Sequence, residues 1–376
     1  MKVLFLIESL AGGGAEKVLT TLVRNIDKDK FDVMVCAISG GGKYEDEVKR
    51  FCKYKALLGT PASLLTKVLY IIKHHLIYKW LPFRYVYKLF VPKGYDVEVA
   101  FTEGFATKIL SASSNERKIA WVHIDLKNNH WTRSVYKNDE HEKKSYSRFS
   151  KVVCVSDTAK DGFLHEFKGI SVPVETLYNP IDAPLIRSMA YGNGSLLHDY
   201  TLLVSAGRLE RQKGYDRLVR IIKRLVGETY NVRLWILGVG TQESELKKYV
   251  DENGLNDVVE FKGFCSNPYK YMLQGDLFVC SSRAEGYSTA VTEALILGLP
   301  VITTECSGMR ELLKDGECGV VTDNNEEALY AGLKRLLDDK SMLMHYKTKA
   351  VERGDDFSMA KLMEPIENLL MNITKQ

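Results

Sequence analysis

Residues 1–25, MKVLFLIESLAGGGAEKVLTTLVRN, begin with an apolar run, pass through a glycine turn and continue into a helical pattern. Val3–Ile7 is short and almost wholly apolar, which is typical of a buried strand. The glycines of Gly12–Gly14 follow it, and Ala15–Asn25 has helical character. A strand, a tight turn and a helix in this order predict the opening unit of a doubly wound α/β domain.

Short strand-like runs alternate with helical segments along the rest of the chain, in two series. Such alternation is typical of parallel sheets covered on both faces. The fold class is therefore α/β, with two doubly wound, Rossmann-like domains facing a cleft, where ligands bind at the carboxyl ends of the strands. We expect the first domain to span 1–183 and the second 184–359, because the turn Asn179–Asp182 separates the two series. The other runs are Asp32–Ile38, Val97–Phe101, Lys118–Val122 and Val152–Val155 in the first series, and Thr201–Ser205, Val232–Leu237, Val258–Phe261, Leu277–Cys280 and Pro300–Thr303 in the second.

The composition is that of a soluble globular protein, with 45% apolar and 27% charged residues in 376 positions. No run of 18 apolar residues is present to span a membrane, and the start does not resemble a signal peptide. The seven cysteines include no Cys-x-x-Cys pair, so we expect reduced thiols, no zinc and a cytoplasmic location.

Positive charge is concentrated in one stretch, because no Asp or Glu lies between Glu47 and Asp96. The stretch holds ten cations and the whole chain carries +4, so the remainder carries −6. Aromatic residues interleave with these cations, and apolar pairs recur at helical spacing. Three interpretations stay open: an amphipathic helix at an anionic membrane surface, a core helix, or a nucleic-acid surface. We favour the membrane for residues 64–93 and expect no nucleic-acid partner, because no nucleic-acid fold signature is present.

The glycine turn predicts a phosphate contact, since backbone amides at a helix start bind anions and glycine allows close approach. A simple tight turn is the structural alternative. A dehydrogenase is disfavoured for two reasons. The last glycine of the G-x-G-x-x-G pattern, counted from Gly12, is replaced by Lys17, and the second strand ends at Ser39 rather than at an acid.

Two cations, Arg208 and Lys213, lie in the loop SAGRLERQKG after the first strand of the second series. Cations converging at the carboxyl end of a strand can hold a diphosphate and stabilise it as a leaving group. A solvated basic turn is the alternative, but the placement of the loop favours a function.

The segment EGYSTAVTE places Glu285 in a loop and Glu293 in the first turns of a helix. Ser288 and Thr289 suit the helix N-cap, and the free amides there can face a phosphate. The two acids can then bind sugar hydroxyls. They are equally explained, taken alone, as acids that favour a helix start.

Together these motifs resemble glycosyltransferase family 4, whose members are retaining enzymes of the GT-B fold. The resemblance covers nearly the whole chain and runs through AGGGAEK, NPID, SAGRLERQKG, LGVG, KGFCSNPYKYM, EGYSTAVTEAL and LGLPVITTECSGMREL in order. It implies a metal-independent enzyme. From the same resemblance we expect a C-terminal helix, at about 360–376, to pack back on the first domain.

The resemblance also implies roles for individual residues. Glu285 matches the glutamate that contacts the donor sugar, Glu293 the one that binds the ribose, and Arg208 with Lys213 the phosphate-binding pair. His123 matches a histidine near the donor sugar and the reaction centre, although a lone histidine is often structural. With His123, Glu285, Arg208 and Lys213 as the catalytic set, the remaining donor-binding candidates are Gly13, Gly14, Gly238, Gly263, Phe264, Gly286, Tyr287, Ser288 and Thr289.

The expected reaction moves a hexose or N-acetylhexosamine from a nucleoside diphosphate, with UDP chosen from its frequency in the family, to an acceptor hydroxyl. The expected acceptor is a lipid-linked glycan intermediate of a surface polysaccharide or glycolipid, at the inner face of the plasma membrane. Two alternatives remain: a sugar-nucleotide epimerase or hydrolase on the same fold, and a non-catalytic, membrane-docked subunit that binds nucleotide sugar. A D-x-D motif, Asp27-Lys28-Asp29, precedes a strand and is interpreted as a solvated turn, so no metal is expected.

Overall fold

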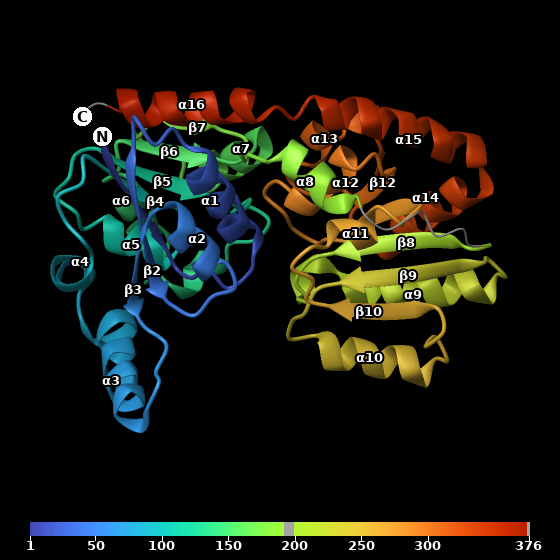
Figure 1. Ribbon diagram of the computed structural model, residues 1–376, viewed down its shortest axis with the longest axis horizontal. Helices are drawn as coiled ribbons and strands as arrows, with labels where there is room; N and C mark the ends of the chain where they lie inside the picture. The colour runs from blue at the N-terminus through green and yellow to red at the C-terminus, as the bar shows by residue number, and fades with distance from the viewer. Residues whose placement is uncertain (192–198, 374–376) are drawn as a thin grey trace. The chain divides into compact units, whose positions relative to one another are not determined.

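The computed structural model describes residues 1–191 and 199–373, and the chain divides into two compact units (Figure 1). The first unit comprises Met1–Pro180 and Ala360–Gln376, and the second comprises Ile181–Met359. The division falls slightly before the predicted boundary at residue 183. Each unit contains one parallel sheet with helices, so the predicted α/β class is confirmed.

The first unit has a seven-stranded sheet in the order β3-β2-β1-β4-β5-β6-β7, and its strand pairs are all parallel. The central strand β1 is buried from Val3 to Ile7, in agreement with its continuous apolar run. The two edge strands, β3 and β7, were not predicted, because one alternates with lysine and the other has three residues. The strands are β1 Lys2–Ile7, β2 Asp32–Ser39, β3 Lys53–Leu58, β4 Val97–Ala100, β5 Lys118–Val122, β6 Lys151–Cys154 and β7 Val174–Thr176.

Helices connect these strands, and the last helix of the chain returns to the first unit. In α16 the side chain of Glu367 accepts a hydrogen bond from the backbone N–H of Asp27, at 2.9 Å. The helices are α1 Gly14–Asn25, α2 Glu45–Phe51, α3 Leu64–His75, the π-helix η1 Leu76–Trp80, α4 Phe83–Phe90, α5 Phe105–Leu110, the 3₁₀ turn η2 Trp131–Ser134, α6 Asp139–Tyr146, α7 Asp157–Glu166 and α16 Met359–Asn372.

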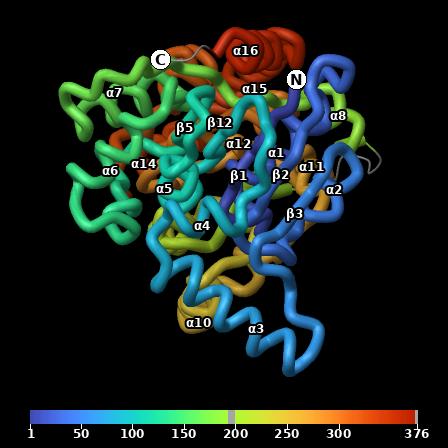
Figure 2. Tube along the Cα trace, turned by 90° about the vertical axis from the view of Figure 1, so that its left-hand side faces the viewer, coloured from blue at the N-terminus to red at the C-terminus, as the bar shows by residue number. Residues whose placement is uncertain are grey.

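The basic stretch 64–93 is not one helix, because it is divided into α3, η1 and α4. Pro82 lies between η1 and α4 and has no backbone N–H to continue a helix. Figures 1 and 2 both show α3 projecting from the first unit beyond the end of its sheet. No residue of α3 is buried, whereas Ile77 of η1 and Val86 of α4 belong to the core. The stretch is therefore anchored by its second half and exposed in its first.

The second unit has a six-stranded parallel sheet in the order β10-β9-β8-β11-β12-β13. Five of its strands follow the predicted series, and the three-residue edge strand β13 was not predicted. The strands are β8 Thr201–Ala206, β9 Val232–Leu237, β10 Val259–Gly263, β11 Leu277–Cys280, β12 Val301–Thr304 and β13 Val320–Thr322.

Amphipathic helices cover this sheet, and α9 shows how the sequence specifies them. Its Leu218, Ile221, Ile222 and Leu225 recur at helical spacing and are buried against the strands. The helices are α8 Ala183–Ala190, the 3₁₀ turn η3 Arg211–Lys213, α9 Tyr215–Gly227, α10 Glu243–Glu252, α11 Tyr269–Met272, α12 Thr289–Ile296, α13 Met309–Leu312, the 3₁₀ turn η4 Lys314–Gly316, α14 Glu326–Asp338 and α15 Lys340–Asp355.

Each sheet has one point at which the order of strand connection reverses. In the first unit it lies between β1 and β4, and in the second between β8 and β11. Loops on the two sides of such a point diverge at the carboxyl ends of the strands and leave a crevice that binds ligands. Ligand-binding residues are therefore expected directly after these four strands.

Candidate active site

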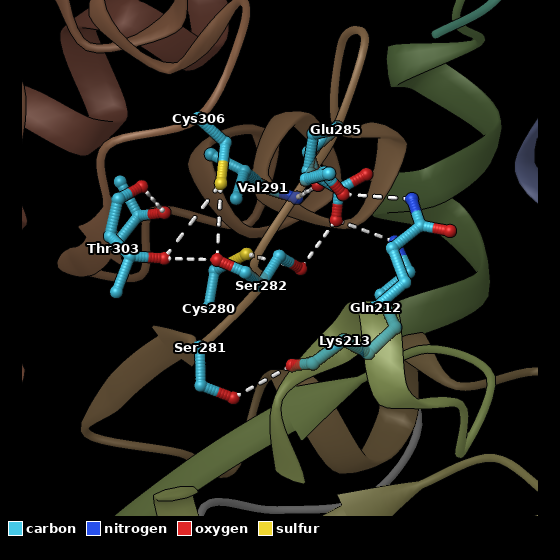
Figure 3. A network of polar contacts seen from close by, with 12 residues as sticks. Gln212, Lys213, Cys280, Ser281, Ser282, Glu285, Val291, Thr303 and Cys306 are labelled. Carbon is cyan, nitrogen blue, oxygen red and sulfur yellow. Dashed lines mark hydrogen bonds and ion pairs between the residues drawn. The ribbon is translucent and has the colours of Figure 1, made fainter. Parts of the chain in front are cut away.

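In the second unit, the loops after β8 and β11 contain three of the predicted catalytic residues. Arg208 and Lys213 follow β8, and Glu285 follows β11. The reversal point thus gathers two motifs that are about 70 positions apart in the sequence. Figure 3 shows the contacts between them.

A direct ion pair joins the two loops. Lys213 Nζ lies 2.6 Å from Glu285 Oε1, and the side chains are only 22% and 9% exposed. The Ser282 hydroxyl donates a second hydrogen bond to the same carboxylate oxygen at 2.5 Å. Burial alone would lower the pKa of Lys213, but the charge of Glu285 holds that pKa above its ordinary value. The lysine is therefore a fixed cation at the reversal point.

Glycine is required at the turn that positions this lysine. Gly214 adopts φ 68°, and a Cβ there would collide with the carbonyl oxygen of Ser281. The Ser281 hydroxyl donates to the Lys213 carbonyl oxygen at 2.9 Å, so the two loops are also joined through their backbones. Gln212 adds a third link, because its amide donates to the Ala284 carbonyl oxygen at 2.8 Å.

Arg217, on α9, is a supporting residue that the sequence motifs did not reveal. The residue is 4% exposed, and its guanidinium donates to the carbonyl oxygens of Ser281 and Ser282 at 2.8 and 2.6 Å. It also donates to the side-chain oxygen of Asn324 at 2.9 Å. Arg217 therefore fixes the backbone that carries Ser282, which in turn binds Glu285. The one signal in the sequence is that Arg217 occupies a position of α9 that faces the sheet, where an apolar residue would be expected.

The predicted helix start beside Glu285 is present. Ser288 is the N-cap of α12, and its side chain accepts a hydrogen bond from the Val291 backbone N–H at 3.4 Å. Gly286 and Tyr287 precede the cap, and Thr289 is the first helical residue. The positive end of the helix dipole thus lies within three residues of Glu285.

Glu293 lies inside α12 and is 4% exposed. A solvated acid that only stabilises the start of the helix would be exposed, so the burial of Glu293 argues against that alternative. Gly308 packs closely on this region, since a Cβ at its φ of 75° would meet the Gly286 carbonyl oxygen at 2.6 Å.

Gly238, Gly263 and Phe264 lie at the carboxyl ends of β9 and β10, on the same edge of the sheet as Arg208. The Gly238 N–H donates to the Gly263 carbonyl oxygen at 2.8 Å. Gly238 adopts φ 142°, and a Cβ there would collide with the carbonyl oxygen of Gly207. Phe264 is 44% exposed beyond them. Arg208 itself is exposed.

The other predicted residues lie in the first unit. Gly14 begins α1 and Gly13 is its N-cap, with no side-chain cap. The space beside Gly13 is occupied by the carboxylate of Glu16, which a Cβ there would overlap. A diphosphate at this helix start would meet that negative charge unless Glu16 turned away.

His123 follows β5, at the carboxyl edge of the first sheet. Burial lowers its pKa to about 3, so the imidazole is neutral at physiological pH. A hydrogen bond to the Phe101 backbone leaves Nε2 without a partner among the described residues. His123 therefore offers a neutral imidazole nitrogen, rather than a cation.

The D-x-D motif lies at the opposite edge, before β2. Asp27 pairs with Lys30 at 2.9 Å, and Asp29 is exposed. Within residues 1–191 and 199–373, no three His, Cys, Asp or Glu side chains are arranged to hold a metal ion. In the same part of the chain, no helix is long and apolar enough to cross a bilayer.

Comparison with known proteins decides the family. Residues 12–184 match the profile of Glycosyltransferase Family 4, and residues 193–353 match that of Glycosyl transferases group 1. The chain belongs to glycosyltransferase family 4. The predicted resemblance is thereby confirmed, and the enzyme class is that of a glycosyltransferase.

The curated proteins that resemble this chain include bacterial glycosyltransferases. A Campylobacter jejuni N-acetylgalactosamine-N,N'-diacetylbacillosaminyl-diphospho-undecaprenol 4-alpha-N-acetylgalactosaminyltransferase is 36% identical over 190 residues. That alignment covers 50% of this chain and 51% of the relative, about half of each. An uncharacterized glycosyltransferase of Haemophilus influenzae is 23% identical over 97% of this chain and 98% of its own.

Solved structures show the same fold over the whole chain. Anabaena Alr3699/HepE, crystallised with UDP-glucose, superposes with a TM-score of 0.77 at 20% identity, covering 99% of both chains. The lipopolysaccharide outer core galactosyltransferase WaaB gives a TM-score of 0.66 at 18% identity, covering all of both chains. The two Rossmann-like domains are thus those of the GT-B fold.

Proposed function

We propose that this family 4 member is a retaining, metal-independent transferase that moves a hexose or N-acetylhexosamine from UDP to a lipid-linked acceptor. One observation carries the proposal: the largely buried Lys213–Glu285 pair, 22% and 9% exposed, lies beside the start of α12, at the reversal point of the second sheet. A cation, a carboxylate and the positive end of a helix are the three groups that suit a sugar diphosphate.

The diphosphate would bind to Lys213, Arg208 and the amides around Ser288. The Lys213 ammonium group donates one of its three N–H bonds to Glu285, so two N–H groups can bind phosphate oxygens. These fixed cations stabilise the charge that develops on the leaving diphosphate, which is the task a metal ion performs in other transferases. UDP as the carrier is supported by the structural neighbour crystallised with UDP-glucose.

Glu285 and Glu293 would bind hydroxyl groups of the sugar and the ribose. Both are buried carboxylates on the two sides of the helix start, and a carboxylate accepts from hydroxyls while repelling phosphate. They are therefore assigned to orientation rather than to acid–base catalysis.

Retention is proposed to follow a front-face route. The bond from the anomeric carbon to the diphosphate oxygen breaks, with its electron pair passing to the phosphate. The acceptor oxygen forms its bond on the same face, and its proton passes to the released phosphate oxygen. Neutral His123, at the carboxyl edge of the first sheet, would hydrogen-bond a sugar hydroxyl through Nε2.

A lipid-linked acceptor fits both the relatives and α3. The Campylobacter relative carries diphospho-undecaprenol in its name. In α3, Leu64 and Leu65 are 80% and 72% exposed, and the lysines of the same stretch can bind anionic lipid. The following π-helix brings the Tyr78 hydroxyl within 3.4 Å of Ser39, at the carboxyl end of β2. One continuous segment thus runs from an apolar surface helix to the edge of the sheet, which supports docking at the inner face of the membrane.

A donor screen tests the proposal most directly. UDP-, GDP- and ADP-sugars are added to the protein, and the one that binds should raise its melting temperature by mass action. Glu285→Gln keeps the shape and should reduce transfer about 100-fold or more, a typical cost of losing one preorganised polar group, while the shift with UDP persists. Glu245→Gln, an exposed acid of α10, is the matched control. Near wild-type transfer by Glu285→Gln would refute the role given to Glu285.

The stereochemical and membrane parts need their own measurements. The anomeric configuration of the product is read by NMR, and inversion, or a trapped glycosyl–enzyme adduct, would contradict the front-face route. Flotation with vesicles of anionic lipid tests docking, and Leu65→Ser/Leu69→Ser should abolish it. The matched control is Met344→Ser/Val351→Ser, which alters two exposed apolar residues of α15 in the other unit. Equal flotation of both variants would eliminate α3 as the docking element.

A further inference from the structure

An exposed tryptophan stands at the carboxyl edge of the first sheet. Trp131 is 38% exposed, yet its indole N–H donates to Glu103 Oε1 at 3.2 Å. Glu103 follows β4 and is 7% exposed, and its other carboxylate oxygen accepts from the His123 backbone N–H at 3.0 Å. One buried acid therefore ties the tryptophan to the histidine predicted at the reaction centre.

The position of the indole is also fixed from a second side. Gly104 adopts φ 83°, and a Cβ there would lie 2.6 Å from the Trp131 ring. Only glycine combines this backbone conformation with room for the ring. An aromatic surface that is fixed before a ligand arrives loses little conformational entropy on binding.

This group lies at the reversal point of the first sheet. Glu103 follows β4 and Glu8 follows β1, the two strands between which the connection order reverses. Ligands of such sheets bind at this place. Both residues present carboxyl groups, which exchange hydrogen bonds with hydroxyls and offer no cation to a phosphate, so this place favours a neutral, hydroxyl-rich ligand.

A buried donor–acceptor without a partner points to the same ligand. The Nε2 atom of His123 is buried and unpaired in the described chain, although buried polar atoms in proteins are nearly always hydrogen-bonded. A ligand hydroxyl would satisfy it. Aromatic face, carboxylate and imidazole together are the groups that bind a pyranose, through its C–H face and its hydroxyls.

We propose that Trp131, Glu103 and His123 form the subsite for the terminal sugar ring of the acceptor. The indole of Trp131 packs against the sugar ring. Glu103 accepts a hydrogen bond from a sugar hydroxyl and also holds Trp131 in place. The inference rests on the proposed transferase function and names the acceptor class at the reacting end: a sugar, not a bare lipid alcohol or a polyol phosphate.

Saturation-transfer NMR with methyl N-acetyl-α-galactosaminide and methyl α-glucoside tests this subsite without requiring turnover. Wild type should bind at least one of these glycosides, and Trp131→Phe should keep most of the signal. Trp131→Leu fills the space without an aromatic ring and should lose the signal about tenfold. Trp80→Leu is the matched control, because Trp80 is an exposed tryptophan of η1 in the same unit, 62% exposed.

Steady-state kinetics then divide the effect between the substrates. With an alkyl-diphosphate-linked N-acetylhexosamine as acceptor, Trp131→Leu should raise the acceptor KM at least tenfold and leave the donor KM within twofold. A purely structural role would give equal losses for Trp131→Leu and Trp131→Phe, and would overturn the proposal. Failure of wild type to bind either glycoside would overturn it as well. If glycosides bind but no nucleotide sugar shifts the melting temperature, the transferase function fails and the sugar subsite stands.

Discussion

The Glu8 carboxyl should make the protein less stable as pH rises, which is the opposite of the effect of an ion-paired acid. Burial, with the nearby charges of Glu103 and Glu16, raises the pKa of Glu8 from 4.5 to about 7. The folded state therefore keeps a proton between these values that the unfolded state has lost, so the free energy of unfolding falls as pH rises through this window. A difference of about 2.5 units corresponds to about 3 kcal/mol.

Glu8→Gln removes the titration and keeps the shape. At pH 8 the variant should be more stable than wild type by up to about 3 kcal/mol, or roughly 6–12 °C in melting temperature for a unit of this size. At pH 4.5, where Glu8 is largely protonated in the folded protein, the difference should nearly vanish. Urea unfolding or thermal melting across pH 4.5–8 measures it.

Glu364→Gln is the matched control, because Glu364 is an exposed acid of α16 in the same unit. Its effect should be small and should not follow the window between pH 4.5 and 7. The reasoning is refuted if Glu8→Gln gives the same stability difference at every pH, or if it destabilises the protein most at pH 8.

Two further predictions concern the second unit, and a third concerns metal independence. Lys213→Met should lower the free energy of unfolding by about 3 kcal/mol, because it leaves the Glu285 charge buried without its cation. The double variant Lys213→Met/Glu285→Gln should recover most of that stability in urea unfolding. If the single and double variants are destabilised equally, the two residues are not coupled. Gly238→Ala should lower stability by about 2 kcal/mol or more and weaken UDP binding, because its Cβ collides with Gly207; a neutral result would remove the close approach as a constraint. EDTA should leave the transfer rate unchanged, and a loss restored by Mg²⁺ would contradict metal independence.

The sequence predicted local structure well where a single segment determines it. The apolar run and glycine turn of residues 1–14 placed β1 and the start of α1, and Ser288 was identified as the cap of α12. Edge strands escaped detection because they are short or half-exposed, so periodicity is weak there. The predicted helical stretch 64–93 is divided because Pro82 interrupts it and because its two halves differ in burial.

The site was predicted as separate motifs, and its connections were not. That Lys213 and Glu285 form an ion pair depends on the strand order that brings β8 beside β11, which no local pattern reports. Arg217 looks like any cation of an amphipathic helix until the carbonyls of Ser281 and Ser282 surround it. Trp131 carries no motif at all, and its role follows only from its bond to a buried acid.

The two reversal points carry different chemical groups, cations in the second unit and carboxyl groups in the first, and this difference divides the substrates between the units. Lys213 and Arg208, with the start of α12, give the second unit a positive edge that suits a diphosphate. Glu8 and Glu103 place carboxyl groups and no cation after the two central strands of the first unit, and carboxyl groups pair with hydroxyls rather than with phosphate. The donor nucleotide therefore belongs to the second unit and a neutral sugar of the acceptor to the first. On this argument, Glu103→Lys should reduce use of the acceptor sugar without improving UDP binding, because α1, the helix that begins at this edge, has Gly13 as its N-cap with no side-chain cap and the Glu16 carboxylate beside it.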